Sequence, residues 1–439
     1  MSAVIILQNL LTYSVNLADN IMIGNYSETA MNGVSLANQI QFLLQMLTMG
    51  AANGLSVLAS QYWGKKQTEP IKKIFSSACV FGLGMSLVLA VFVIAAPNTA
   101  LGLLTDKQDA IAEGSKYIVI LGFTYCIYTL TNLLLGMLRS VETVKIGFFV
   151  TAVSLVVNVC LNYCLIFGNF GFPELGVKGA AYATFSARIV ELIVVCIYVF
   201  FIDKKIRFKV KDFFIIDKSY MMDFIKAGLP LIGSSFSWGI AMTIQTAIIG
   251  RLDSPAALGA NNIATTIYQV VSVLYNSMSN SSSVIIGKTV GEHDYDRVKK
   301  YSKLLQIIFV ITGVVSSIIM FLSGDAIISL YNVAPETTQL AKTFIYILCI
   351  TIVGSCYEAP CLCGIVSGGG DTKFVLYNDL IFMWGIVLPL AVLSAFVFKW
   401  SIPVTFFILK ADQILKCFVA IIKVNRFKWI KELTRNDKT

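Results

Sequence analysis

The stretch Leu17-Ala-Asp-Asn-Ile-Met-Ile-Gly24 has a counterpart much later in the chain, Thr243-Ile-Gln-Thr-Ala-Ile-Ile-Gly250. Both segments lie in long apolar surroundings with few charges. They differ at one informative position, because Asp19 of the first copy corresponds to Gln245 of the second. The pair therefore indicates an internal duplication in which one copy carries a charge that the other lacks.

The composition is that of a polytopic membrane protein. Of the 439 residues, 56% are hydrophobic and only 13% are charged, and the mean hydropathy is +0.76. A soluble domain carries roughly a quarter charged residues. Apolar runs close to the ~20 residues that a helix needs to cross the hydrocarbon core recur along the chain. They predict twelve transmembrane helices, at about 2–23, 34–60, 70–96, 112–138, 146–168, 177–201, 220–249, 259–287, 298–322, 337–365, 374–397 and 402–424.

The duplication predicts two lobes of six helices each. Val4–Gly64 matches Pro230–Gly291, and the order of the spans is the same in both halves. Copies with an even number of spans keep the same orientation, so an axis along the bilayer normal should relate them and leave a central cavity. We expect an all-α protein with an N-terminal lobe at 1–201, a basic cytoplasmic linker at 202–219, a C-terminal lobe at 220–424 and a cytoplasmic tail at 425–439.

The distribution of basic residues among the loops predicts the topology, because Lys and Arg concentrate on the cytoplasmic side. Loops after even-numbered spans are basic, with Lys65, Lys66, Lys72, Lys73, Arg139, Lys145, Lys204, Lys205, Arg207, Lys209, Lys211, Lys218, Lys288, Arg297, Lys299, Lys300 and Lys373. Both termini should therefore be cytoplasmic, in a bacterial plasma membrane. The net charge of +9 is largely this bias and does not indicate a nucleic-acid partner. We expect a monomer in the lipid bilayer.

Four segments, in this order along the chain, resemble the multidrug and toxic compound extrusion (MATE) transporters. They are Asp19-Asn-Ile-Met-Ile-Gly24, Asn158-Val-Cys-Leu-Asn162-Tyr-Cys-Leu-Ile-Phe-Gly168, Leu175-Gly-Val-Lys-Gly-Ala-Ala-Tyr-Ala-Thr184 and Gly368-Gly-Gly-Asp-Thr-Lys373. The resemblance covers nearly the whole chain and implies a twelve-helix fold of two six-helix lobes. It also implies export of organic, often cationic compounds in exchange for Na⁺ or H⁺.

Asp19 is the leading candidate for binding the coupling cation. A carboxylate at membrane depth costs roughly 2.5–3.5 kcal/mol on insertion scales and normally faces a water-filled cavity. Asp19 could exchange a proton, Na⁺ or a cationic substrate, and the resemblance implies cation coupling at this position. An interfacial or structural carboxylate is the alternative. Tyr13 and Asn16 make the same helix unusually polar, and we expect both to line the substrate cavity.

Two asparagines extend the predicted cation site. Asn158 and Asn162 are four residues apart and share one helical face. Their carboxamide oxygens could bind Na⁺ together with Asp19, although interhelical hydrogen bonding is an equal alternative. Some relatives carry aspartate where this chain has Asn162, so their ion site cannot be transferred unchanged. The resemblance implies a site hydroxyl at Thr184, whose alternative role is a bond to its own helix backbone.

The second lobe is predicted to bind substrate rather than the coupling ion. Gln245 can orient a substrate without titrating, and Trp238 could stack on flat cationic compounds. Trp238 stands in the region where sodium-coupled relatives of one branch carry glutamate. Glu358 and Asp379 are acidic residues in apolar company and are further candidates for lining the cavity. Small organic cations are the expected substrates.

Other function classes fit the sequence less well. An integral-membrane enzyme would need convergent nucleophiles, bases or metal ligands, whereas the chain has one histidine and no metal-spaced Cys or His cluster. We therefore expect no enzyme activity and no cofactor besides the coupling Na⁺ or H⁺. A lipid-linked oligosaccharide flippase of the same broad superfamily is the closer alternative. It would favour a cationic cavity, whereas the intramembrane charges read from the sequence are mainly acidic.

Overall fold

The computed structural model describes residues 1–252, 254–329, 331 and 333–435. Within the helices, the side chains of residues 16, 17, 28 and 255 also lie outside the described part. The described chain is nearly all helical. Its first half contains α1 (Ser2–Tyr26), α2 (Glu28–Gly64), α3 (Thr68–Ala95), α4 (Pro97–Gly102), α5 (Gln108–Gly122), α6 (Thr124–Ser140), α7 (Lys145–Phe167), a 3₁₀ turn (Asn169–Gly171) and α8 (Val177–Ile197).

The second half repeats this pattern of long helices with more irregular turns. A π-helical turn (Tyr198–Ile202) continues α8, and a 3₁₀ turn (Val210–Phe214) lies in the linker. Then follow α9 (Lys218–Gly250), α10 (Pro255–Gly291), α11 (Tyr295–Ile328), α12 (Pro335–Ala359) with the π-helical Pro360–Val366, α13 (Thr372–Asp379), the π-helical Leu380–Val387, α14 (Leu388–Val392), the π-helical Leu393–Val397, α15 (Ile402–Leu409) and α16 (Asp412–Asn425).

The twelve predicted spans each coincide with a helix or with a run of helical segments. In the described part of the chain, eight helices are long and apolar enough to cross a membrane, and α5 with α6 would add a ninth, bent by 50°. The three remaining predicted spans correspond to α1, α10 and α15 with α16. α10 is more polar and contains the run Asn276-Ser-Met-Ser-Asn-Ser-Ser-Ser283, whereas α15 and α16 are each short, with 8 and 14 residues.

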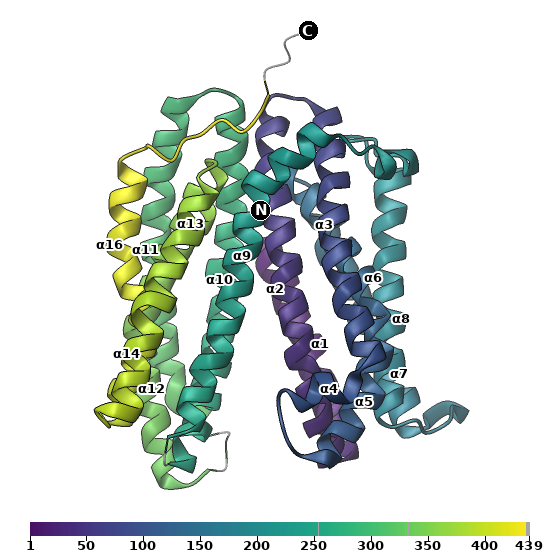
Figure 1. Ribbon diagram of the computed structural model, residues 1–439, viewed down its shortest axis with the longest axis vertical. Helices are drawn as coiled ribbons and strands as arrows, with labels where there is room; N and C mark the ends of the chain where they lie inside the picture. Colours follow the sequence, from purple (N-terminus) through teal and green to yellow (C-terminus); the bar gives the residue numbers. More distant parts are fainter. Residues whose placement is uncertain (253, 330, 332, 436–439) are drawn as a thin grey trace. The chain divides into compact units, whose positions relative to one another are not determined.

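The helices form two compact units. The first comprises mainly 3–59 and 66–232, and the second comprises mainly 60–65 and the chain from 233 onward. In the first unit α7 packs along α8, and in the second α11 packs along α12 (Figure 1). Each unit has its own apolar core, around Ile118 and Leu121 in the first and around Phe344 and Phe406 in the second. The predicted lobe boundaries at 201 and 220 stay a prediction.

The basic linker packs against α3 through aromatic and polar contacts. The ring of Phe75 lies 5.1 Å from that of Phe208 and 5.4 Å from that of Phe213, both edge to face. The Lys72 ammonium lies 3.3 Å from the buried carboxylate of Asp212. The linker is thus attached to the first unit by a small core of its own.

The end of α2 belongs to the second unit, where it packs closely against the end of α10. Gly64 and Gly291, which the repeat pairs with each other, both lie at this contact. A Cβ on Gly64 would be 2.1 Å from the Lys288 carbonyl oxygen, and one on Gly291 would be 1.9 Å from that of Gln61. Both distances are far below a van der Waals contact, so only glycine permits the two backbones to approach this closely.

A segment after α16, which we name the C-terminal strap (Trp429–Arg435), runs over the end of α2. Gln61 is fully buried: its side-chain nitrogen donates to the carbonyl oxygens of Gly368 at 3.3 Å and Lys431 at 3.2 Å. Its side-chain oxygen accepts from the Leu433 amide at 2.8 Å. Trp429 is also fully buried and donates its indole N–H to the Val424 carbonyl. The yellow segment in Figure 1 shows the strap leaving α16.

Ion pairs add to the attachment of the strap. Asp371, in the glycine-rich turn before α13, accepts from Lys423 and Lys431 at 2.8 Å each. Burial alone would raise the pKa of Asp371, but these two hydrogen bonds outweigh it and hold the pKa below its usual range. Lys65 at the end of α2 lies 2.6 Å from Glu432. The strap is therefore joined to α2 and to this turn by both neutral and charged contacts.

Candidate functional site

The four predicted coupling residues lie together in the first unit. Asp19 of α1 is 8% exposed and accepts a hydrogen bond from the side-chain nitrogen of Asn162 on α7. The same nitrogen lies 3.2 Å from the side-chain oxygen of Asn158. Asn158 in turn donates to the hydroxyl of Thr184 on α8 at 3.4 Å. The asparagines reach Asp19 because their four-residue spacing puts both on one face of α7.

A small polar cavity adjoins the Asp19 carboxylate. Its volume is about 20 Å³, enough for roughly one water molecule. It is lined by Val15, Asp19, Asn38, Gln41, Tyr117, Ser154, Asn158, Thr184, Ala187 and Arg188. The side-chain oxygen of Asn162 is buried and has no hydrogen-bond partner among the described residues. The cavity thus combines the Asp19 carboxylate, the Asn158 carboxamide and the Thr184 hydroxyl with room for one small guest, and Asn162 contacts Asp19 without lining it.

Arg188 contributes a positive charge to this cavity without pairing with Asp19. Its guanidinium donates to both oxygens of Glu191, three residues further along the same helix, at 3.0 and 2.8 Å. The same group lies over the Tyr128 ring, 4.9 Å from its centroid. Within the described part of the chain, Asp19 has no ion-pair partner within 4.0 Å. Its negative charge is therefore available to a diffusible cation.

The donor set of this cavity fits a hard monovalent cation. Carboxylate, carboxamide and hydroxyl oxygens are the ligands that such ions prefer. Asp19 with the lining residues Asn158 and Thr184 would hold Na⁺, and a proton would require Asp19 alone. Softer metal ions fit less well, because the described residues contain no cluster of three or more His, Cys, Asp or Glu.

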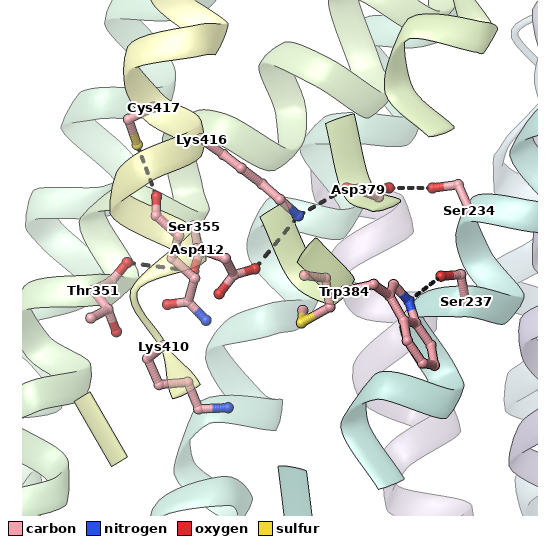
Figure 2. A network of polar contacts seen from close by, with 12 residues as sticks. Ser234, Ser237, Thr351, Ser355, Asp379, Trp384, Lys410, Asp412, Lys416 and Cys417 are labelled. Carbon is pink, nitrogen blue, oxygen red and sulfur yellow. Dashed lines mark hydrogen bonds and ion pairs between the residues drawn. The ribbon is translucent and has the colours of Figure 1, made fainter. Parts of the chain in front are cut away.

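The second unit contains a buried network of opposite charges. The Lys416 ammonium lies 2.9 Å from Asp379 and 3.5 Å from Asp412, and Ser234 donates its hydroxyl hydrogen to Asp379 (Figure 2). Glu358 is close enough to interact electrostatically with all three charged groups. Here the carboxylates already have a cation, the tethered ammonium of Lys416, in contrast to Asp19.

Gln245 lies next to a second buried lysine. The Lys410 ammonium donates to the side-chain oxygen of Gln245 at 3.1 Å. The side-chain nitrogen of Gln245 lies 3.4 Å from the Met383 sulfur. Trp238 packs, half-buried, against the apolar core of this unit. The neighbouring Trp384 donates its indole N–H to Ser237 at 2.6 Å (Figure 2).

Comparison with known proteins decides the family. The MatE family model matches residues 5–164 and 230–393, the two copies of the repeat. The chain belongs to the MatE family. Similar relatives include the "Uncharacterized transporter YisQ" of Bacillus subtilis, 27% identical and covering 86% of this chain and 82% of its own length. The "Probable multidrug resistance protein NorM" of Bacillus cereus is 25% identical, with 89% and 86% covered.

Solved structures give the same fold. A mutant of the Vibrio cholerae MATE transporter VcmN has a TM-score of 0.88 at 16% identity, covering 99% of this chain and 96% of its own. A MOP superfamily transporter from Pyrococcus furiosus has a TM-score of 0.87, with 98% and 95% covered. The twelve-helix, two-lobe fold of the MATE transporters is thereby confirmed. Members of the family are transporters, so the membrane-enzyme alternative is set aside.

Several predicted site residues of the MatE chain lie outside these two clusters. Tyr13 is exposed on α1 and does not line the Asp19 cavity. Asn16 is on α1 as well, but its side chain lies outside the described residues. The cavity roles of Tyr13, Asn16, Trp238 and Glu358 stay predictions.

Sequence reasoning assigned no pair to Lys410 and passed over Lys416 in the MatE C-terminal unit. Both lysines are buried within the last span. Their presence corrects the picture of mainly acidic intramembrane charge, because this unit carries both signs. A signal for Lys416 was available, since it follows Asp412 by four residues, the spacing of a helical ion pair.

Proposed function

We propose that this MatE protein is a secondary active exporter of organic compounds in which Asp19 binds the coupling Na⁺ or H⁺. Relatives from Bacillus cereus and Streptococcus pneumoniae are named as probable multidrug resistance proteins, which supports organic compounds as cargo. The main support for the proposal is the Asp19 carboxylate, which is buried and has no ion-pair partner among the described residues. The neighbouring Asn162 has a side-chain oxygen without a hydrogen-bond partner there.

The physical role of Asp19 follows from the cost of its charge. An uncompensated carboxylate in the membrane is unfavourable, so binding of Na⁺ or a proton lowers that cost and favours a different conformational state. Cation binding and release can then be coupled to alternating access of the cargo. One charge moving across 100 mV provides ~2.3 kcal/mol, enough for a roughly 50-fold concentration ratio.

The charged residues also indicate which compounds are exported and how the protein is oriented in the membrane. Glu358 near the charged network and the aromatic Trp238 support organic cations among the exported compounds. The basic loops favour cytoplasmic termini in a bacterial plasma membrane. Green fluorescent protein fused after the C-terminus would fluoresce if that end is cytoplasmic, and alkaline phosphatase at the same place would be inactive. The reverse pattern would contradict this orientation.

The test of coupling is efflux from proteoliposomes loaded with a fluorescent organic cation. Asp19→Asn keeps the shape and hydrogen-bonding capacity of the side chain but removes its charge. We expect efflux driven by a Na⁺ gradient and by a pH gradient, applied separately, to fall to the level of protein-free vesicles. Asp325→Asn is the matched control, because Asp325 is exposed and paired with Lys342. Unchanged gradient-driven efflux in Asp19→Asn would refute the proposed role.

The two gradients also separate the coupling ions. If Na⁺ is the driver, Asn162→Leu removes the side chain that contacts Asp19 and should raise the Na⁺ concentration for half-maximal efflux. If H⁺ is the driver, efflux should not depend on external Na⁺, either in the unmodified protein or in Asn162→Leu. Efflux in both variants is compared at equal amounts of reconstituted protein.

A further inference from the structure

The last membrane span is interrupted at Lys410. Helix α15 ends at Leu409 and α16 begins at Asp412, and Lys410 itself has the non-helical dihedral angles φ −109° and ψ 1°. The backbone amides at the break remain bonded within the chain, since Lys410 donates to Phe407 and Ala411 to Ile408, both at 3.1 Å. A ligand at the break would therefore bind the lysine side chain rather than these backbone amides. Discontinuous helices are where membrane transporters place binding groups.

Lys410 is a buried cation without an ion-pair partner among the described residues. The residue is 9% exposed, and no carboxylate there lies within 4.0 Å of its ammonium. Asp412 interacts with Lys410 electrostatically but forms its ion pair with Lys416. The ammonium has three N–H donors, and one is bonded, to the neutral oxygen of Gln245. A buried charge in this state is costly unless an anion completes it.

Two aromatic rings lie near the Lys410 ammonium. Its ammonium lies 5.5 Å from the ring centroid of Tyr268 and 5.9 Å from that of Phe406. Gln413, in the first turn of α16, donates to the Tyr268 hydroxyl at 3.1 Å. The side-chain oxygen of Gln413 is buried without a partner among the described residues, and as an acceptor it suits a donor group of a ligand rather than its carboxylate. Spare ammonium donors and two aromatic rings thus occur together.

We propose that Lys410 binds the carboxylate of an organic compound exported by this protein, with Gln245 as the neutral acceptor that the carboxylate displaces. A carboxylate brings a negative charge to the buried ammonium, which the neutral amide oxygen of Gln245 does not, so a carboxylate outcompetes the amide oxygen. Lys416 does not serve in this way, because Asp379 and Asp412 already neutralise it. The proposal rests on the exporter function above and adds a substrate class, compounds that carry a carboxylate.

The test uses purified full-length protein in detergent and two dyes, tetramethylrhodamine, which has a free carboxylate, and its methyl ester. Fluorescence polarisation gives both affinities without an ion gradient. We expect Lys410→Gln to weaken binding of the carboxylate dye by about tenfold or more, since a charge-assisted bond is lost, and binding of the ester by less than about twofold. Lys410→Arg should retain the preference. Lys342→Gln, at an exposed lysine, is the matched control and should change neither affinity.

Three results would overturn the proposal: equal loss of both dyes in folded Lys410→Gln, no loss of either, or an unmodified protein that fails to bind the carboxylate dye. Thermal unfolding identifies a variant that does not fold. In that event the unmodified protein decides, because benzoate should displace the carboxylate dye and benzamide should not. The dye experiment and the efflux experiment can fail independently. Dye binding is measured without an ion gradient, so a preference for the carboxylate dye at Lys410 does not depend on whether Asp19→Asn loses gradient-driven efflux.

Discussion

Gln61 should control how often the C-terminal strap detaches. Its side chain makes three hydrogen bonds, two at 3.3 and 3.2 Å and one at 2.8 Å. Three average bonds contribute about 1.5–4.5 kcal/mol in net terms, and the two long bonds place the sum in the lower part of this range, about 1.5–3 kcal/mol. Gln61→Leu removes all three at nearly constant volume. The detached population should therefore rise roughly 10- to 100-fold.

Limited proteolysis with trypsin measures this population. Cleavage after Lys431 requires the strap to leave Gln61 and Gly369, and its rate follows the detached fraction when reattachment is faster than cleavage. The C-terminal peptide is quantified by mass spectrometry at several trypsin concentrations. Gln108→Leu, at an exposed glutamine of α5, is the matched control. An unchanged cleavage rate in Gln61→Leu would refute the view that this side chain holds the strap.

Three further predictions concern stability, measured by thermal unfolding in detergent. Gly291→Ala should destabilise the protein by about 1–3 kcal/mol because its Cβ meets the Gln61 carbonyl, whereas Gly84→Ala, with open space around it, should be neutral or stabilising. Lys416→Met should cost about 3–5 kcal/mol by leaving Asp379 and Asp412 unpaired, and Asp379→Asn in the same chain should recover part of it; no recovery would contradict the pairing. Asp371→Asn should destabilise at neutral pH, and the difference should shrink as the pH falls below about 4, the unfolded-state pKa, and vanish only below the lower folded-state pKa. A difference that does not shrink as the pH falls would contradict this assignment.

The helical framework could be predicted from the sequence because hydrophobic length is a local property. Each run of about 20 apolar residues becomes a helix, whatever its neighbours are. The cluster around Asp19 could also be predicted from the sequence. Its two asparagines share a face by spacing alone, and the family resemblance supplied Asp19 and Thr184. The structure adds the contact between Asp19 and Asn162, which are 143 residues apart.

Contacts between side chains on different helices could not be predicted from the sequence. The sequence gives no reason for Lys410 to reach Gln245 rather than water, because that contact depends on the break between α15 and α16 and on how α9 packs beside it. The three-residue spacing of Arg188 and Glu191 suits a pair on one helix, but the position of Arg188 on the Asp19 cavity depends on the packing of α8 against α7. The strap has an ordinary polar composition, so no local pattern identifies it as buried structure.

The strap also sets an order of events during synthesis of the protein. Gln61 and Lys431 are 370 residues apart in the chain. At about 5–20 residues per second, the ribosome needs roughly 20–70 s to make the second partner after the first. For that interval the buried donor and acceptors of Gln61 must be satisfied by water or by a chaperone. The end of α2 can therefore reach its final packing only after all the membrane spans have been made, which makes strap docking a late checkpoint in assembly.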